Sequence, residues 1–341
     1  MREAVVIGGT GFIGSYLVEA LVQSGWRVRV VSRSGGTDRL HDGVTFVRAA
    51  VSDADALGKA IAGAEYVFHL ATGGGAGWAD FERDYIAGTR TVAEACLKHG
   101  VRRLIYTSSI AALDLGRNVT VTEAEGVDPQ PEVRGMYCRA KVAAEGILNE
   151  MHARQGLDVV ILRPAVVMGR GGLLAHSGVG QWPSDGCCIG WGAGRNPLPF
   201  VLAEDVASAC VLAMTAAGAA GRTFNLVGDV MISAREYVER AAAFSMRNLR
   251  FYPQSLLKLQ ALEVMKWVLK CAARKADNPF PSYRDLKSRS LQTRLDCSAA
   301  KNVLGWRPNA DKEHFFREAV YSHIAPVAPA DLRLAELPRA F

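Results

Sequence analysis

Short apolar runs alternate with longer helical patterns through the first half of the chain, and this alternation constrains the fold more than any other feature. The runs are β-branched and bounded by Gly, Asp or Ser, which is typical of strands buried on both faces. They are Ala4–Ile7, Val28–Ser32, Val44–Val47, Tyr66–His69, Leu104–Thr107 and Val159–Leu162, with helical patterns at Phe12–Gln23, Ala54–Ala62, Phe81–His99 and Met136–Arg154. Such alternation builds right-handed βαβ units, so we expect an α/β fold with a doubly wound parallel sheet that binds ligands at the carboxyl ends of its strands.

The pattern changes after Pro164. A Gly-rich stretch over Gly169–Asn196 has the length of a functional loop region, after which Ala203–Thr215 and Thr223–Val227 are predicted to return to the sheet as a helix and a strand. The remainder is mostly helical. We therefore expect two interleaved domains. The sheet domain comprises residues 1–168 and 198–228, and a smaller, mostly helical substrate-binding domain comprises residues 169–197 and 229–341.

Composition narrows the class of protein. With 49% apolar and 22% charged residues among 341, the chain is neither disordered nor collagen-like. A net charge of +6 is too small to indicate a nucleic-acid partner. Seven scattered cysteines without C-x-x-C, and histidines without H-E-x-x-H, argue against a disulfide framework and against a metal site. Without a signal peptide or an apolar run of about 18 residues, the protein is expected in the cytoplasm.

The first predicted strand leads directly into Gly8-Gly9-Thr10-Gly11-Phe12-Ile13-Gly14, where the next helix begins. One glycine of such a loop permits a tight turn, one lets the backbone approach a pyrophosphate, and one allows close helix–sheet packing. The free amides and the dipole at the start of the helix then face the phosphates. Between a strand and a helix, this pattern predicts that the sheet domain binds a dinucleotide.

The end of the second predicted strand distinguishes between the two nicotinamide dinucleotides. Sites for NAD usually carry Asp or Glu there, about 20 residues after the glycines, to bind the ribose hydroxyls. Here the residues are Ser32, Arg33 and Ser34. A guanidinium can bind a 2′-phosphate through two hydrogen bonds, and two hydroxyls flank it. We therefore expect NADP in preference to NAD.

Tyr137 and Lys141 lie four residues apart on a predicted helix and so share one face. A tyrosine has a pKa of about 10, which a nearby ammonium lowers toward the range useful for proton transfer. Thr107-Ser108-Ser109 ends the fifth predicted strand, at the sheet edge where ligands bind. Together these residues indicate an acid–base group beside a hydroxyl that can bind a substrate oxygen.

Further motifs follow in order along nearly the whole chain. They are Phe68-His69-Leu70-Ala71, Tyr106-Thr107-Ser108-Ser109, Leu162-Arg163-Pro164, Leu198-Pro199-Phe200-Val201, Glu204-Asp205-Val206-Ala207 and Leu304-Gly305-Trp306-x-Pro308. With the glycine loop and Tyr137-x-x-x-Lys141, the chain resembles the extended short-chain dehydrogenase/reductase superfamily, the NAD(P)-dependent epimerase/dehydratase family. Residues 107–110 resemble its 3β-hydroxysteroid dehydrogenase-like branch, which acts on hydrophobic alcohols and ketones.

The resemblance implies roles for individual residues. It makes Tyr137 the proton donor and acceptor, while Lys141 lowers the pKa of Tyr137 and binds the nicotinamide ribose. Ser109, rather than Ser108, binds the substrate oxygen. The implied cofactor contacts are Gly8, Gly11, Phe12, Ile13, Gly14, Ser32, Arg33, Ser34, Ala71, Tyr137, Lys141 and Pro164. A homodimer through the helices around residues 81–99 and 136–154 is also implied.

Several positions depart from the family pattern. Ala49-Ala50 replaces the Gly-Asp that often follows the third strand, and Asp53 is expected to cap the next helix. Tyr85 stands where Asn is often found, and residues 113–116 and 167–169 lack the Val-Tyr-Gly of sugar-nucleotide enzymes. His69 lies inside a buried strand, which favours a core histidine.

Three functions follow from these patterns. The favoured one is an NADP-dependent oxidoreductase that transfers a hydride between nicotinamide and a small or hydrophobic alcohol or ketone. The alternative is a sugar-nucleotide epimerase or dehydratase that recycles its bound cofactor in each turnover. A nucleotide sensor or scaffold without turnover is disfavoured, because Ser109, Tyr137 and Lys141 are all present.

Residues 255–275 form an amphipathic helical pattern. Its charged side chains Glu263, Lys266, Lys270 and Arg274 lie on a narrow stripe, and Leu, Val, Met and Trp side chains fill the wide remainder. Such a helix can cover a hydrophobic substrate as a lid, form a dimer contact or lie peripherally in a membrane interface. The sequence leaves these three alternatives open.

Overall fold

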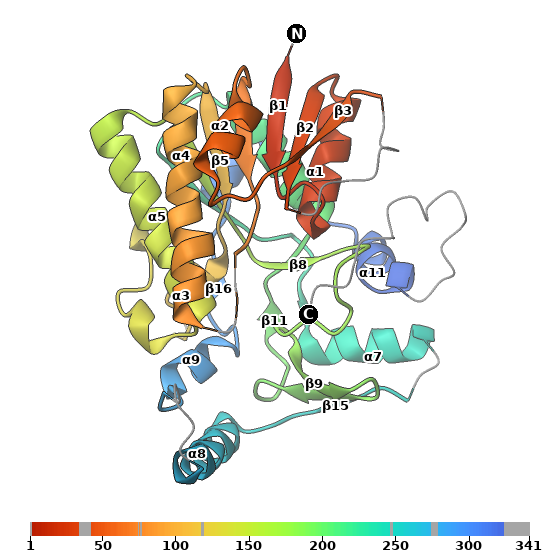
Figure 1. Cartoon of the computed structure of the whole chain (residues 1–341). Helices are drawn as coiled ribbons and strands as arrows, with labels where there is room; N and C mark the ends of the chain where they lie inside the picture. The colour runs from red at the N-terminus through yellow and green to blue at the C-terminus, as the bar shows by residue number, and fades with distance from the viewer. Residues whose placement is uncertain are drawn as a thin grey trace.

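Seven parallel strands form the central sheet, in the order β13-β7-β5-β4-β1-β2-β3 (Figure 1). The computed structural model describes residues 2–33, 42–73, 75, 77–116, 119–245, 248–273 and 279–323. The sheet strands are β1 (Glu3–Ile7), β2 (Arg27–Ser32), β3 (Val44–Arg48), β4 (Tyr66–His69), β5 (Arg103–Thr107), β7 (Val159–Pro164) and β13 (Thr223–Leu226). The predicted doubly wound Rossmann fold is confirmed.

Helices cover both faces of the sheet, which explains why its strands are continuously apolar. These helices are α1 (Phe12–Gln23), α2 (Ala54–Ile61), α4 (Gly88–Lys98), α5 (Met136–Gln155) and α6 (Ala203–Thr215). In β1, Val6 packs into the core beneath α1 and α6, whereas its neighbour Val5 packs into the core beneath α2, α4 and α5. Successive side chains of a strand point to opposite faces, so each of the two cores takes alternate residues.

The helical pattern predicted over Phe81–His99 is helical in the structure, but it is not one regular α-helix. The structure has three consecutive segments there, α3 (Trp78–Phe81), the π-helical η1 (Glu82–Ala87) and α4. A Cβ added to Gly73 would lie 2.6 Å from the carbonyl carbon of Asp84, so the chain leaving β4 passes directly against η1. Hydrophobic periodicity does not distinguish a wide turn of this kind from an α-helical one, and such turns occur frequently at functional sites.

The remaining elements form a smaller layer beyond the carboxyl ends of the sheet strands (Figure 1). Its strands are β6 (Thr120–Val121), β8 (Val166–Met168), β9 (Gly180–Ser184), β10 (Cys187–Gly190), β11 (Pro197–Leu198), β12 (Phe200–Leu202), β14 (Ile232–Ser233), β15 (Arg250–Tyr252) and β16 (Arg294–Leu295). Its helices are α7 (Ala234–Ser245), α8 (Leu256–Ala272), α9 (Tyr283–Ser288), α10 (Ser298–Val303) and α11 (Lys312–Ala319), with 3₁₀ turns η2 (Ile110–Ala112), η3 (Glu123–Glu125), η4 (Pro131–Val133) and η5 (Tyr321–His323).

This layer contains more strand than the sequence indicated. β9, β10 and β15 form a three-stranded sheet, and β6 pairs with β16. These strands are short and pair across long stretches of chain, which local patterns do not reveal. Within the described part of the chain, no helix is both long and apolar enough to cross a bilayer.

A cluster of charges joins α9 to the start of α5. The buried carboxylate of Asp128 accepts hydrogen bonds from Arg134 Nη1 and from Arg284 Nη2, each at 2.6 Å. Asp285 Oδ1 accepts from Arg134 Nε at 3.2 Å and from the backbone amide of Gly135 at 3.0 Å. Gly135 is the N-cap residue of α5 and carries no capping side chain, so α9 supplies the cap from a distant part of the sequence.

Replacing Asp285 with Ala should lower the free energy of unfolding by about 1–3 kcal/mol, because it removes this cap and one carboxylate partner of Arg134. Urea unfolding followed by circular dichroism measures the change. Asp285→Asn is the matched control, because its amide oxygen can still accept from Gly135 and should preserve part of the stability. An Asp285→Ala protein as stable as the unaltered one would show that α5 does not depend on α9.

Candidate active site

The glycine loop connects β1 to α1 through a turn that only glycine adopts without strain. Gly8 has φ +85°, and its amide donates to Val31 O at 2.9 Å. Gly11 donates to Gly8 O at 3.0 Å and forms the N-cap of α1. The cap residue has no side chain, and the first turn of α1 contains no acidic residue. Nothing in that turn therefore competes with an anion for the helix amides.

The backbone packs so closely around this loop that two of its glycines have no room for a side chain. A Cβ on Gly8 would lie 2.7 Å from Ala71 N, and one on Gly14 would lie 2.2 Å from Gly8 O. Ala71, which follows β4, is therefore in contact with the loop, as predicted for a shared cofactor site. These glycines and the amides of α1 fit a dinucleotide pyrophosphate.

Of three other predicted cofactor contacts, Phe12 and Ile13 begin α1 beside this loop, whereas Pro164 lies three strands away. Phe12 begins α1, and a Cβ on Gly172 would lie 2.7 Å from its ring, so the segment that follows β8 passes over Phe12. Ile13 packs its side chain against the core beneath α1, which leaves its backbone amide for a ligand. Pro164 ends β7 and is buried beside β13.

Two guanidinium groups lie at the carboxyl ends of β2 and β3. Arg33 follows β2 and is exposed, and Arg48 Nε donates to Arg33 O at 3.1 Å. Sequence reasoning missed Arg48, which the β2–β3 register places opposite Ser32. The pKa of Asp84 is lowered, chiefly by the Arg83 hydrogen bond and in part by the charge of Arg33, so Arg33 faces η1. The third predicted residue, Ser34, lies outside the described residues.

Ser109, Tyr137 and Lys141 meet at the end of β5, where the sequence placed them. Tyr137 is in the first turn of α5 and 41% exposed, whereas Lys141, one turn later, is buried. Lys141 Nζ lies 5.7 Å from the centre of the Tyr137 ring. Desolvation raises the pKa of Tyr137 and a hydrogen bond with Ser109 opposes that rise, so the lowering by Lys141 that the resemblance implies is not found in the protein alone. Ser109 is fixed in turn because its Oγ accepts from the Ala111 amide at 3.1 Å.

Lys141 is held by one carbonyl and by aromatic rings. Its Nζ donates to Thr107 O at 2.6 Å, and it lies 5.0 Å from the ring centre of Tyr106 and 5.1 Å from that of Tyr85. Burial lowers the pKa of Lys141 to about 7, with the charge of Glu145 opposing the shift. The faces of phenol rings attract a cation, so Tyr85 and Tyr106 stabilise the charged form. The sequence marked Tyr85 only as a departure from the family pattern.

Ser108 has a different task from Ser109. It is buried, and its Oγ donates to Glu145 Oε1 at 2.5 Å. Glu145 also accepts from Arg163, with Arg163 Nη2 at 2.6 Å from Oε2, and both charges are buried. Ser108 therefore supports a buried ion pair between α5 and β7, and its hydroxyl is not directed at a substrate.

His69 is a core residue, as its place in a buried strand indicated. Its Nε2 lies 3.2 Å from Thr89 Oγ1. Burial, and to a lesser extent the charge of Lys141, lowers its pKa to about 3, so the ring stays neutral at ordinary pH. Asp53 accepts from the Ala56 amide at 3.0 Å and caps α2, as predicted. Among the described residues, no His, Cys, Asp and Glu side chains gather in a group that could hold a metal ion.

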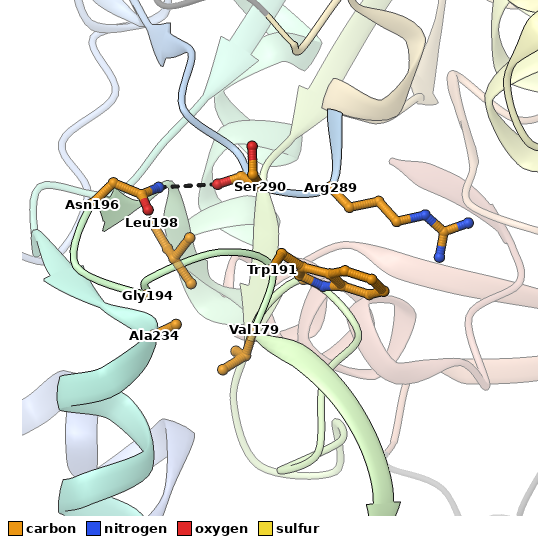
Figure 2. Close-up of a pocket in the computed structure, with 9 residues that line it drawn as sticks. Val179, Trp191, Gly194, Asn196, Leu198, Ala234, Arg289 and Ser290 are labelled. Carbon is orange, nitrogen blue, oxygen red and sulfur yellow. Dashed lines mark hydrogen bonds between the residues drawn. The ribbon is translucent and has the colours of Figure 1, made fainter. Parts of the chain in front are cut away.

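A small pocket lies where the Gly-rich stretch meets the C-terminal segments (Figure 2). Figure 2 shows Asn196 Nδ2 donating to Ser290 O, at 3.0 Å, and the Arg289 side chain extending beside Trp191. The Arg289 guanidinium lies 5.4 Å from the Trp191 ring centre. The pocket also includes Val179, Leu198 and Ala234, so its lining is mixed apolar and cationic.

Gly14→Ala should weaken binding of NADPH at least about tenfold, because the added methyl group overlaps Gly8 O and cannot be relieved by moving a side chain. Fluorescence titration of NADPH measures the loss. Gly146→Ala is the matched control, because its Cβ on α5 would meet nothing within 4 Å and should leave binding unchanged. Unaltered affinity in Gly14→Ala would exclude this loop as the pyrophosphate site.

Curated proteins with similar sequences include reductases and dehydrogenases. A 2-alkyl-3-oxoalkanoate reductase of Stenotrophomonas maltophilia is 29% identical over 252 residues, which are 71% of this chain and 75% of that protein. The 3beta-hydroxysteroid-dehydrogenase/decarboxylase isoform 3 of Arabidopsis thaliana is 26% identical over 342 residues, covering 90% of this chain and 58% of that protein. The chain spans 49% to 59% of the length of several other curated relatives.

The fold has counterparts among solved structures. The UDP-glucose 4-epimerase of Thermotoga maritima, in a structure with UDP-glucose, matches with a TM-score of 0.70 and 23% identity over 94% of this chain and 98% of that one. The model of the NAD dependent epimerase/dehydratase family matches residues 4–227, from β1 to the end of β13. The chain therefore belongs to this family of NAD-dependent enzymes, the extended short-chain dehydrogenases/reductases.

Proposed function

We propose that the protein is an NADP-dependent oxidoreductase that reduces the carbonyl group of a hydrophobic ketone, or oxidises the corresponding alcohol. The observation that carries the proposal is the meeting of Ser109, Tyr137 and Lys141 at the carboxyl end of β5. A hydride transfer to carbon requires a proton at the adjoining oxygen, and these residues supply a proton donor and a hydrogen-bond donor.

Each of the three side chains has a separate task in the proposed reaction. NADP, when bound, supplies or accepts the hydride. Ser109 Oγ donates a hydrogen bond that orients the substrate oxygen, and Tyr137 Oη gives that oxygen its proton. Lys141 stabilises the phenolate that remains and binds the nicotinamide ribose. Desolvation raises the pKa of Tyr137 in the protein alone, so the phenol keeps the proton that it would give to the substrate oxygen.

The proposed preference for NADP rests on the ends of β2 and β3. Arg33 follows β2 directly, and Arg48 at the end of β3 donates from Nε to the backbone carbonyl of Arg33. Ser32 is the last residue of β2 and pairs with Arg48 in the strand register. No carboxylate is found at positions 32–34, where an NAD site would bind a ribose diol. Two cations beside a hydroxyl are better suited to a 2′-phosphate.

The proposal that the substrate is hydrophobic is supported by the names of two relatives, and its binding site is assigned to the smaller layer of the structure. Two relatives are named for a 2-alkyl-3-oxoalkanoate and a 3β-hydroxysteroid, both largely apolar compounds. We assign substrate binding to residues 169–197 and 229–341, two segments that pack together around Trp191 and Arg289 (Figure 2). The homodimer through the α4 and α5 regions stays a prediction.

A sugar-nucleotide epimerase is the second candidate, favoured by the fold match to a UDP-glucose 4-epimerase. The two reactions differ in their redox balance. An oxidoreductase consumes one NADPH for each ketone reduced, whereas an epimerase retains its cofactor and shows no net consumption. Incubation with NADPH and either a 2-alkyl-3-oxoalkanoate or UDP-glucose distinguishes them through nicotinamide absorbance and product analysis.

Tyr137→Phe should lower kcat for reduction of a 2-alkyl-3-oxoalkanoate about 10²- to 10⁴-fold, because it removes the proton donor. The Kd for NADPH should stay unchanged, because the ring remains. Tyr66→Phe is the matched control, since Tyr66 begins β4 at the amino end of the sheet strands and its hydroxyl makes no hydrogen bond with the residues that the structure describes. Undiminished turnover in Tyr137→Phe would remove Tyr137 from the proposed acid role.

Arg33→Ala should raise the Kd for NADPH about tenfold and leave the Kd for NADH unchanged, because only NADPH carries the 2′-phosphate. Arg102→Ala is the control for the loss of one positive charge. Arg102 is an exposed arginine just before β5, at the amino ends of the sheet strands, whereas Arg33 lies at their carboxyl ends. Equal losses for the two dinucleotides would contradict a 2′-phosphate contact.

A further inference from the structure

Helix α8 (Leu256–Ala272) projects from the smaller layer at the end of the molecule farthest from β1 (Figure 1). Leu259 is its one buried residue and packs with Trp191 and Leu286. Gln260 Nε2 donates to Pro281 O at 2.7 Å, which ties the same side of α8 to the segment before α9. One side of the helix is thus anchored, and the other is presented outward.

The outward side of α8 is apolar. Its exposed side chains are Leu257 (69% exposed), Leu262 (46%), Met265 (53%), Val268 (52%) and Leu269 (63%). At 3.6 residues per turn these five lie within one arc of the helix surface, roughly 140° wide. Single exposed apolar residues are ordinary, whereas a contiguous group of this kind marks a surface that binds something.

Basic side chains accompany this apolar face. Lys258 lies within the arc, whereas Lys266 and Lys270 lie about 40° and 80° beyond its edge, on either side of the buried Leu259. Glu263 is the only acidic residue of α8, and its Oε1 is paired with Lys266 Nζ at 2.8 Å. The helix therefore combines an apolar surface with a net positive charge. Arg274, which the sequence placed on the same charged stripe, lies outside the described residues.

The chain that follows α8 packs against the anchored side of the helix, where Trp267 lies about 20° from Gln260 at 3.6 residues per turn. Phe280 is 62% exposed, and its ring meets the Trp267 ring edge-on with centroids 5.2 Å apart. Because α8 projects from the body, its outward face is convex. The three lysines of α8 outnumber its single carboxylate, so an anionic lipid surface complements this helix better than a second copy that carries the same charge.

We propose that the α8 face, defined by Leu257, Leu262, Met265, Val268 and Leu269, lies in the interface of an anionic lipid bilayer. The apolar side chains enter the boundary between headgroups and acyl chains, and the three lysines bind anionic headgroups. The anchored side keeps Leu259 in its own cluster, so docking requires no unfolding. This inference does not depend on the proposed reaction.

The test is flotation of the full chain with vesicles of phosphatidylcholine alone and of phosphatidylcholine with phosphatidylglycerol. We expect the protein to float with the anionic vesicles at least about tenfold more than with the neutral ones, and added salt should reduce the difference. Protein that remains unbound to both kinds of vesicle would overturn the proposal. Equal binding to both would overturn the role of the lysines.

Substitutions separate the contribution of the apolar side chains from that of the lysines. Met265→Glu with Leu269→Glu should abolish flotation, and Lys258→Gln with Lys266→Gln and Lys270→Gln should remove the preference for phosphatidylglycerol. Met231→Glu is the matched control, because Met231 is 59% exposed but lies just before β14, and it should float normally. NADPH titration and thermal unfolding confirm that each variant is folded.

If the α8 face instead forms a dimer contact, light scattering and flotation give a different pair of results. If light scattering shows a dimer that the Met265→Glu, Leu269→Glu protein loses, and neither protein floats, then α8 binds a second copy and the proposal is wrong.

Discussion

The burial of one ammonium group at the end of β5 is the constraint on which the rest of this site depends. Lys141 Nζ is out of water, and it is held by Thr107 O at 2.6 Å and by the phenol rings of Tyr85 and Tyr106. These partners come from β5 and η1, while Lys141 itself comes from α5. Displacing any of these elements would leave a buried amine without its hydrogen-bond or ring partners, at a cost of about 1–3 kcal/mol.

A second buried charge pair stabilises the same junction. Glu145 lies one turn after Lys141 on α5 and binds Arg163 on β7 and Ser108 after β5. Helix α5 is thus fixed against two central strands by hydrogen-bonded charges, and its first turn is capped by Asp285 from α9. These contacts fix the position of Tyr137, which lies in that first turn. The Tyr137 ring itself is partly exposed, on the side where a substrate would bind.

Sequence patterns within single segments predicted the strands of the central sheet, their flanking helices and the residues at the strand ends. The helices α1 and α6 have the predicted bounds. Ser109 meets Tyr137 because the connection from β5 to the parallel strand β7 starts its helix α5 beyond the carboxyl end of β5. The residues that sequence reasoning missed depend on pairing or on unusual backbone. Arg48 required the β2–β3 register, Tyr85 required a π-helical turn, and the Asp285 cap joins parts of the chain that are far apart.

The most direct test of the account is a crystal structure of the protein with NADP bound. It should place the pyrophosphate on the glycine loop and the nicotinamide ring beside Tyr137, with the ribose hydroxyls at about 3 Å from Lys141 Nζ. A nicotinamide ring bound away from the end of β5, with Lys141 out of reach of the ribose, would contradict the account.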